Sequence, residues 1–366
     1  MNLQLNSNTT FYLLLTLSIT SFVVVVLFWG KIFRKGLLNL FSRTLILLLI
    51  QVLILVSVGV GINRSQGFYS SWTDLFGGTQ DFTSAAISTD ALSAITLKEI
   101  TGAKKFGNST IAIKQTIKGS MSGVSNIVYL LLPTSAAKEI KAGRVLNPNR
   151  FQIVEFLTGF PSKPEMWFKA LSLQNDVATY NSTHRKAIIG VIPEINVAGQ
   201  KDLECMNLPN GEPAAETWLT SDMKSFLDKK LGFTSNRWFA AGVSTGGWCA
   251  YMFAINHTEQ FSGALSIAGY YRAALPLKDP IALQNKMIAK YNVTTMEAAL
   301  QQKVPLYVTA SLGDKYSIRE TTRFLAKPHP NLEIKYHEIA TGGHNPRVWK
   351  SSITPGLNWL ASKAIN

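Results

Sequence analysis

The chain has 366 residues, 46% of them hydrophobic, with a formal net charge of +14 from 36 Lys and Arg against 22 Asp and Glu. This length suits one α/β catalytic domain with an accessory segment. The basic residues are scattered, without the aromatic-interleaved clusters that nucleic-acid binding requires, so we expect no nucleic-acid partner. A surface facing an anionic membrane or envelope polymer explains the charge.

Two uncharged apolar runs lie near the N-terminus, at residues 11–29 and 45–62. At the helical rise, each run approaches the thickness of the hydrocarbon core of a bilayer, about 30 Å. No Lys or Arg precedes the first run and no small-residue cleavage site follows it. This pattern favours two transmembrane helices over a cleaved signal peptide.

The segment between these runs, residues 30–44, carries Lys31, Arg34, Lys35 and Arg43, whereas residues 1–10 carry no charge. The positive-inside rule predicts a cytoplasmic basic loop here and places everything after residue 62 outside the cytoplasm. Residues 63–105 are rich in Ser, Thr, Gly and Asp and predict a linker. We therefore expect a protein of the cell membrane whose remaining domain is extracytoplasmic.

Residues 106–366 alternate between strand and helix patterns, as in a doubly wound α/β sheet of the α/β-hydrolase type. An opening hairpin begins near Thr110. A mostly helical insertion at about residues 270–302 has the size of a cap over a pocket. The predicted strands are residues 151–157, 187–194, 237–243, 263–269, 304–313 and 332–340, and the predicted helices are residues 217–231, 245–256 and 348–364.

Ser244 lies in the sequence Gly242-Val-Ser244-Thr-Gly246, which follows an apolar strand and leads into a helix. A G-x-S-x-G pattern in this setting predicts a nucleophile elbow, whose turn is so tight that its flanking positions need glycine. The helix that starts behind the serine favours negative charge near the serine oxygen. A glycine-serine turn in a dinucleotide-binding domain is the alternative.

A serine nucleophile needs a base, because its hydroxyl is barely ionised at neutral pH. His344, in the sequence TGGHNP, follows the last predicted strand, the place where this fold keeps its catalytic imidazole. The alternative for His344 is a loop histidine with no function. The other four histidines lie within a strand, in loops before strands, or behind the elbow helix: His184, His257, His329 and His337.

The third member of a triad should be a carboxylate after the preceding strand, and Asp314 in SLGDKYS has that position. The order Ser244, Asp314, His344 is the order of this fold. Glu320 is the alternative acid. The second oxyanion-hole donor, beside the amide of Thr245, is predicted to be the amide of Phe160 in the turn after strand 151–157.

Several segments together resemble the putative esterase family of actinobacteria, which is related to S-formylglutathione hydrolase and the mycobacterial mycolyltransferases: GVSTGGWCA, LTGFP, DLECMNLP and GGHNPRVW. The similarity covers roughly residues 110 to 362. It implies a triad on Ser244, Asp314 and His344 and an oxyanion hole at Phe160 and Thr245. Two cysteines alone leave open a disulfide or two free thiols, and the resemblance implies a Cys205–Cys249 bridge.

Three functions follow from this reading. The first is a serine esterase that cleaves a carboxylic ester through an acyl-enzyme. The second is an acyltransferase, similar to a mycolyltransferase, that moves an acyl group from an acyl-lipid to a sugar or lipid hydroxyl. Mycolyltransferases have a bulkier residue after the serine and then a second serine, so Thr245-Gly246-Gly247 favours hydrolysis. The third is a non-catalytic binding protein. No metal or cofactor is expected, and Asp202 and Glu216 are predicted to have solvated or capping roles.

Overall fold

The computed structural model describes residues 5, 7–32, 37–66, 68–69, 72–76, 103–199, 201–209, 211–231, 238–275 and 279–363. Residues 33–36 of the predicted basic loop, 77–102 of the predicted linker and 276–278 of the predicted cap lie outside this description. The chain divides into two compact units, one of which contains Met1–Gly78, Ser311–Tyr316 and Ala340–Asn345. The other contains most of the sheet with its covering helices.

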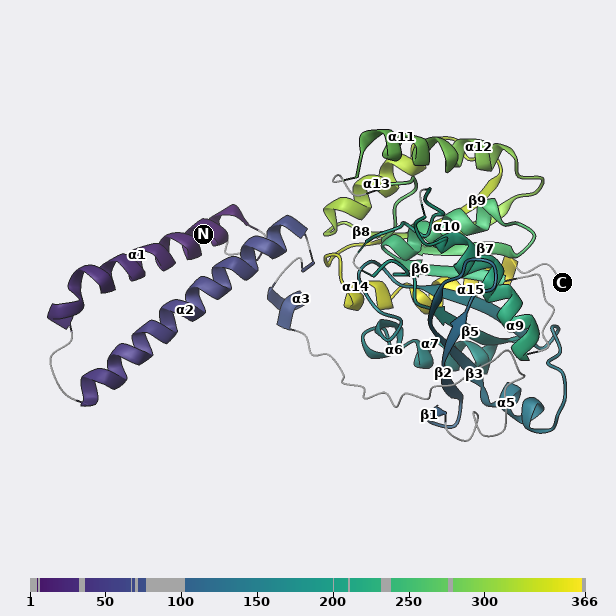
Figure 1. The fold of residues 1–366 in the computed structure, drawn as a ribbon, viewed down its shortest axis with the longest axis horizontal. Helices are drawn as coiled ribbons and strands as arrows, with labels where there is room; N and C mark the ends of the chain where they lie inside the picture. The colour runs from purple at the N-terminus through teal and green to yellow at the C-terminus, as the bar shows by residue number, and fades with distance from the viewer. Residues whose placement is uncertain are drawn as a thin grey trace. The chain divides into compact units, whose positions relative to one another are not determined.

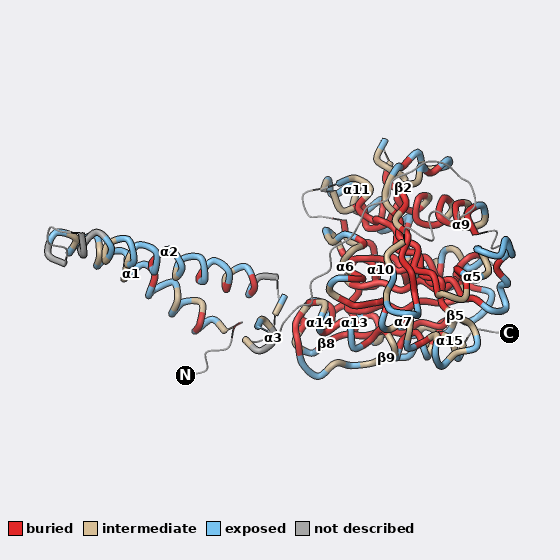
Figure 2. The backbone as a smooth tube through the Cα atoms, turned by 90° about the horizontal axis from the view of Figure 1, so that it is seen from below, coloured by how far each residue is buried: buried red, intermediate tan, exposed pale blue. Residues whose placement is uncertain are grey.

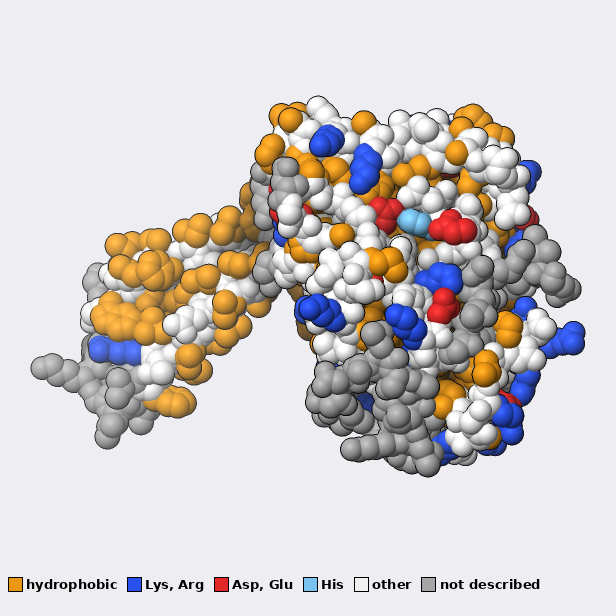
Figure 3. All heavy atoms as spheres, turned by 45° about the vertical axis from the view of Figure 1, so that its right-hand side comes forward, with side chains coloured by type: hydrophobic (Ala, Val, Ile, Leu, Met, Phe, Trp, Pro, Cys, Tyr) orange, Lys and Arg blue, Asp and Glu red, His pale blue; other side chains and the backbone are white. Residues whose placement is uncertain are grey.

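Two long helices, α1 (Asn8–Ile32) and α2 (Leu37–Gln66), form an apolar hairpin in the first unit. Hydrophobic side chains cover the outside of both helices (Figure 3), and the exposed positions of the hairpin stand out in Figure 2. The Ser18 and Ser57 hydroxyls hydrogen-bond between the helices at 2.9 Å. Helix α1 extends to Ile32 and α2 begins at Leu37, so both helices continue into the predicted loop of residues 30–44. Both helices have the length and composition to cross a membrane, which is compatible with an anchor or a signal sequence.

The described strands form one mixed sheet in the order β1-β2-β3-β5-β4-β6-β7-β8-β9 (Figure 1). Strands β1, β2, β3 and β5 pair antiparallel, whereas β5, β4, β6, β7 and β8 run parallel. The carboxyl ends of these parallel strands therefore meet at one edge. The strands are β1 (Lys104–Phe106), β2 (Thr110–Lys118), β3 (Ser125–Pro133), β4 (Phe151–Leu157), β5 (Ala187–Pro193), β6 (Trp238–Val243), β7 (Phe261–Ile267), β8 (Val304–Ser311) and β9 (Leu332–Ile339).

Helices cover both faces of the sheet, and successive residues of a strand enter different cores because side chains alternate across a strand. On β4, Ile153 and Leu157 join the core beneath α9 (Met223–Leu231) and α10 (Thr245–Asn256). Val154 and Phe156 join the opposite core. That second core lies beneath α6 (Met166–Lys169), α7 (Leu173–Thr183) and α15 (Ile353–Lys363).

The remaining helices lie in the connections between the strands or after the hairpin. They are α3 (Trp72–Phe76), α5 (Thr134–Lys141), α8 (Ala215–Thr217), the π-helical turn η1 (Trp218–Asp222), α11 (Ile281–Lys290), α12 (Val293–Ala298), α13 (Lys315–Leu325) and α14 (Pro346–Lys350). The predicted helix of residues 217–231 is thus divided by a π-helical turn. The predicted closing helix is divided into α14 and α15.

Candidate active site

Ser244 lies between the end of β6 and the start of α10, with φ 56° and ψ −121°. A serine seldom adopts this positive φ, and a nucleophile elbow requires it. A Cβ added to Gly242 would lie 1.9 Å from the Gly246 carbonyl oxygen, and one added to Gly246 would lie 2.2 Å from the Leu157 oxygen. Both positions therefore admit only glycine, which is the physical reason for the G-x-S-x-G pattern.

The helix behind Ser244 supplies electrostatic support for negative charge. The first backbone N–H groups of a helix have no intrahelical acceptor and carry the positive end of its dipole. Residues 245–255 of α10 are all buried. The field of this helix is therefore poorly screened by water, and it stabilises negative charge on the serine oxygen.

The predicted oxyanion turn passes directly beside the nucleophile. A Cβ added to Gly159 would lie 2.9 Å from the Ser244 Cβ, so the backbone at Gly159 and Phe160 approaches the serine closely. The Phe160–Pro161 peptide bond is cis. No hydrogen bond within the described chain engages the Phe160 amide, and Thr245 is the first residue of α10. Both amides can thus donate to an oxygen bound at Ser244.

Asp314 and His344 are hydrogen-bonded, with 2.5 Å between the Asp314 Oδ2 and the His344 Nδ1. Asp314 lies in the loop after β8, and His344 lies in the loop after β9. A hydrogen bond from the Ser311 hydroxyl to the Gly342 carbonyl, at 2.5 Å, connects these two loops. Asp314 is only 2% exposed. A buried carboxylate at Nδ1 keeps a proton on that nitrogen, so Nε2 becomes the basic atom of the ring.

The alternative acid, Glu320, has different partners. It accepts hydrogen bonds from Arg272 Nε at 3.4 Å, Arg319 Nε at 3.3 Å and Arg323 Nη1 at 2.9 Å. Its carboxylate is therefore held by arginines on the described chain, whereas Asp314 is held by a histidine. This difference favours Asp314 as the acid.

A buried acidic group that the sequence did not reveal lies against the elbow helix. The Tyr270 hydroxyl donates to Glu204 at 2.6 Å, and the Glu204 amide donates to Asp202 Oδ1 at 2.9 Å. The Thr245 side chain also interacts with both Asp202 and Tyr270. Burial raises the pKa of Asp202 to about 6. Burial and the neighbouring Asp202 raise the pKa of Glu204 well above its usual range.

The loop that carries these carboxyl groups is fixed to α10 by a disulfide between Cys205 and Cys249. Trp248 Nε1 also donates to the Glu204 carbonyl at 3.1 Å. Glu204 and Cys205 both have positive φ, 53° and 55°, a conformation that costs non-glycine residues free energy and persists only where the surroundings impose it. The disulfide therefore holds a strained loop beside the nucleophile.

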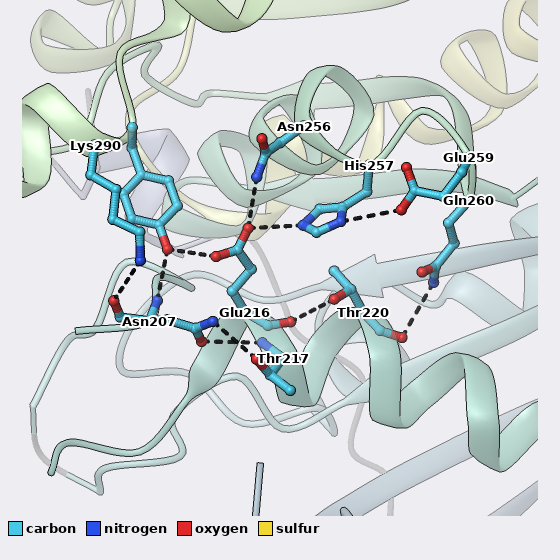
Figure 4. A network of polar contacts seen from close by, with 10 residues as sticks. Asn207, Glu216, Thr217, Thr220, Asn256, His257, Glu259, Gln260 and Lys290 are labelled. Carbon is cyan, nitrogen blue, oxygen red and sulfur yellow. Dashed lines mark hydrogen bonds and ion pairs between the residues drawn. The ribbon is translucent and has the colours of Figure 1, made fainter. Parts of the chain in front are cut away.

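A second polar network, centred on Glu216, lies at the other end of α10 (Figure 4). Glu216 accepts hydrogen bonds from Asn256 and His257, each at 2.8 Å, and from the Tyr291 hydroxyl at 2.5 Å. The Tyr291 oxygen in turn accepts the Asn207 amide at 2.9 Å. The predicted solvated or capping role for Glu216 is wrong, because its carboxylate is buried and connects four segments of the chain.

The Glu216–His257 pair predicts a pH-dependent stability. Burial opposes the charged imidazole, but Glu216 and Glu259 outweigh it and raise the pKa of His257. A raised pKa stabilises the fold below about pH 6.5, and this contribution is lost as the pH rises through the folded pKa. We expect His257→Gln to lower the free energy of unfolding by about 1–3 kcal/mol at pH 6 and by less at pH 9. Urea unfolding of the detergent-solubilised chain at both pH values measures this, and an equal loss at both would contradict it.

Together, the mixed sheet and the strand–serine–helix elbow define a serine hydrolase of the α/β-hydrolase type. The chain belongs to the family described as Putative esterase, whose model matches residues 147–360. The predicted resemblance to a putative esterase family and the predicted α/β-hydrolase fold class are therefore confirmed. A comparison with curated proteins finds no match.

Solved structures of several serine hydrolases share this fold. A ferulic acid esterase has a TM-score of 0.55 at 14% identity, over 70% of this chain and 99% of its own. S-formylglutathione hydrolase from Agrobacterium tumefaciens has a TM-score of 0.54 at 12% identity, over 70% and 97%. Fluorophosphonate-binding serine hydrolase F of Staphylococcus aureus has a TM-score of 0.54 at 13% identity, over 69% and 99%.

Proposed function

We propose that this protein is a membrane-anchored, extracytoplasmic serine esterase that cleaves carboxylic esters through an acyl-enzyme, with Ser244, Asp314 and His344 as its triad. The observation that carries the proposal is the elbow, which holds Ser244 at positive φ beside two available amides. The Asp314–His344 hydrogen bond supports the assignment of the acid and the base.

The proposed reaction has two halves. His344 Nε2 takes the proton of Ser244 as its oxygen attacks the ester carbonyl, and the amides of Phe160 and Thr245 stabilise the oxyanion. The imidazolium returns the proton to the leaving alcohol oxygen as the carbon–oxygen bond breaks. Water then attacks the acyl-enzyme with the same assistance, which releases the carboxylic acid and restores Ser244.

Labelling with a fluorophosphonate probe tests the nucleophile. We expect the wild-type chain to react covalently at Ser244 and Ser244→Ala to lose all labelling while it keeps the wild-type melting temperature. Ser351→Ala, at an exposed serine of the same domain, is the matched control and should label normally. A folded wild-type chain that stays unlabelled would contradict the proposed function and favour a non-catalytic binding protein.

The proposed location has support from two separate features of the chain. The apolar hairpin suits an anchor, and a disulfide such as Cys205–Cys249 persists in oxidising compartments rather than in the cytosol. Protease added outside intact spheroplasts tests this topology. We expect the protease to digest the domain after residue 103. Protection of this domain from the protease would overturn the extracytoplasmic placement.

Acyl transfer is a second candidate function, because Asp202 and Tyr270 lie beside Thr245. The Asp202 carboxyl, which is only partly buried, is in a position to hydrogen-bond the hydroxyl of a sugar or lipid acceptor. Product analysis with p-nitrophenyl butyrate, with and without glycerol, separates the two reactions. If the protein hydrolyses esters, butyric acid is the only acyl product under both conditions. If it transfers acyl groups, glyceryl butyrate is the main acyl product when glycerol is present.

A further inference from the structure

A pocket of about 350 Å³ lies between α12 and α13, and its lining includes none of the proposed triad residues. Its volume is at the small end of the range for sites that enclose small molecules. Three exposed or half-exposed cationic side chains reach it from different elements: Arg272 after β7, Arg323 on α13 and Lys327 after α13. Nothing in the proposed ester cleavage uses this group of charges.

The two arginines are held in place by one buried carboxylate. Glu320, only 5% exposed, accepts one N–H from Arg272 and one from Arg323. A guanidinium has five N–H donors, so each arginine retains donors for another acceptor. Lys327 has no carboxylate partner within the described chain. The Glu320 carboxylate thus fixes the orientation of both arginines, and their remaining N–H groups are available to a bound molecule.

The second carboxylate of the pocket is also occupied. Glu297 accepts a hydrogen bond from the Tyr251 hydroxyl and faces His329 Nδ1 at 2.7 Å. His329 Nε2 donates to the Phe324 carbonyl at 2.8 Å. Both carboxylates are thus engaged by the protein, and the three cationic side chains of the lining exceed its two carboxylates by one formal positive charge.

The rest of the wall is apolar and rigid. Tyr271 and Phe324 stack with their ring centroids 4.1 Å apart, and the centroid of the His329 ring also lies 4.1 Å from that of Phe324. Val293 and Pro328 complete this surface. A molecule that fills the pocket therefore needs an apolar part against these residues and an oxygen-rich anion against the arginines, whose planar fork matches carboxylate and phosphate.

We infer that this pocket binds a small amphipathic oxyanion, a carboxylate or phosphate monoester joined to an apolar group, with Arg272, Arg323 and Lys327 as the recognising side chains. The site goes beyond the proposed esterase reaction and does not depend on it. Phosphate could be presented by a soluble metabolite or by a lipid head group, and both share this chemistry.

Isothermal titration calorimetry on the detergent-solubilised full chain tests the site with benzoate and phenyl phosphate, and with neutral benzamide as the uncharged comparison. We expect at least one of the two anions to bind about tenfold or more tightly than benzamide. Arg272→Gln/Arg323→Gln should lose about tenfold in affinity for that anion. Arg319→Gln is the matched control, because Arg319 also contacts Glu320 but does not line the pocket; its affinity should stay within about twofold of wild type.

Equal binding of benzamide and the anions, or unchanged affinity in the double variant, would overturn the inference. Fluorophosphonate labelling of every variant shows that the fold around Ser244 is intact, and it separates failure of this site from failure of the proposed function. Displacement of phenyl phosphate by short-chain phosphatidic acid, but not by glycerol 3-phosphate, would assign the site to a lipid head group. The reverse pattern would assign it to a soluble ligand.

Discussion

Asp314→Asn lowers kcat for p-nitrophenyl butyrate by about 10⁴-fold if the Asp314–His344 pair orients the base. The asparagine side chain has nearly the same shape, so we expect the fold to stay intact. Its amide, however, can present a donor to Nδ1, which favours the tautomer that leaves no basic nitrogen for the serine proton. The loss therefore falls on kcat, with little change in KM, and steady-state kinetics on the purified chain measure it.

Glu320→Gln is the matched control for this experiment. Its carboxylate is held by three arginines, so we expect turnover of the same neutral ester to stay within about threefold of wild type. The opposite pattern, with Glu320→Gln inactive and Asp314→Asn active, would transfer the role of the acid to Glu320. Equal, small losses in both variants would show that neither carboxylate orients the base.

Much of the fold could be predicted because local pattern and final structure agree at the elbow. The predicted bounds of residues 151–157 and 245–256 coincide with β4 and α10. All of β4 and all of α10 except Asn256 are buried, so mostly apolar residues mark these elements and turn residues mark their ends. Asp314 and His344 could be proposed because they follow strands of this sheet, although the hydrogen bond between them depends on loops that no local pattern describes.

The sequence was a poorer guide where long-range contacts decide the structure. Glu216 is polar and would be exposed on an isolated helix, but its partners Asn256, His257 and Tyr291 come from distant segments. Helix α7, with sequence LQNDVATYNST, has few apolar residues and was not predicted. The pairing of Asp202 with Glu204 was missed for the same reason, since the disulfide and the hydrogen bonds from Trp248 and Tyr270 hold that loop against α10.

Removing the disulfide has the largest effect that we expect on stability. The Cys205–Cys249 bridge closes a segment of 44 residues. Loop-closure entropy for this length predicts that Cys205→Ser/Cys249→Ser loses about 4 kcal/mol of unfolding free energy. Such a loss is a large part of the stability of an ordinary domain. Denaturant unfolding of the solubilised chain, monitored by tryptophan fluorescence, measures the shift in midpoint.

A reductant provides the control for this experiment. Added to the wild-type chain, it should lower the midpoint towards that of the double variant, and it should leave the double variant unchanged. Both cysteines of the sequence are in the bridge, so no other thiol complicates the comparison. A midpoint that is insensitive to both the reductant and the substitutions would show that the loop is held by its hydrogen bonds from Trp248 and Tyr270 alone.

The burial of α10, complete except at its last residue, also bears on the timescale of motion at the nucleophile. A helix with no solvent-facing side exchanges its amide hydrogens only when its whole surroundings open, so its protection approaches that of global unfolding. Ser244 directly precedes this helix. Its position is therefore fixed before a substrate binds, and substrate binding is not needed to form it. Adaptation to different esters then falls to the loops around the serine, and diversity among relatives of this chain should be concentrated there.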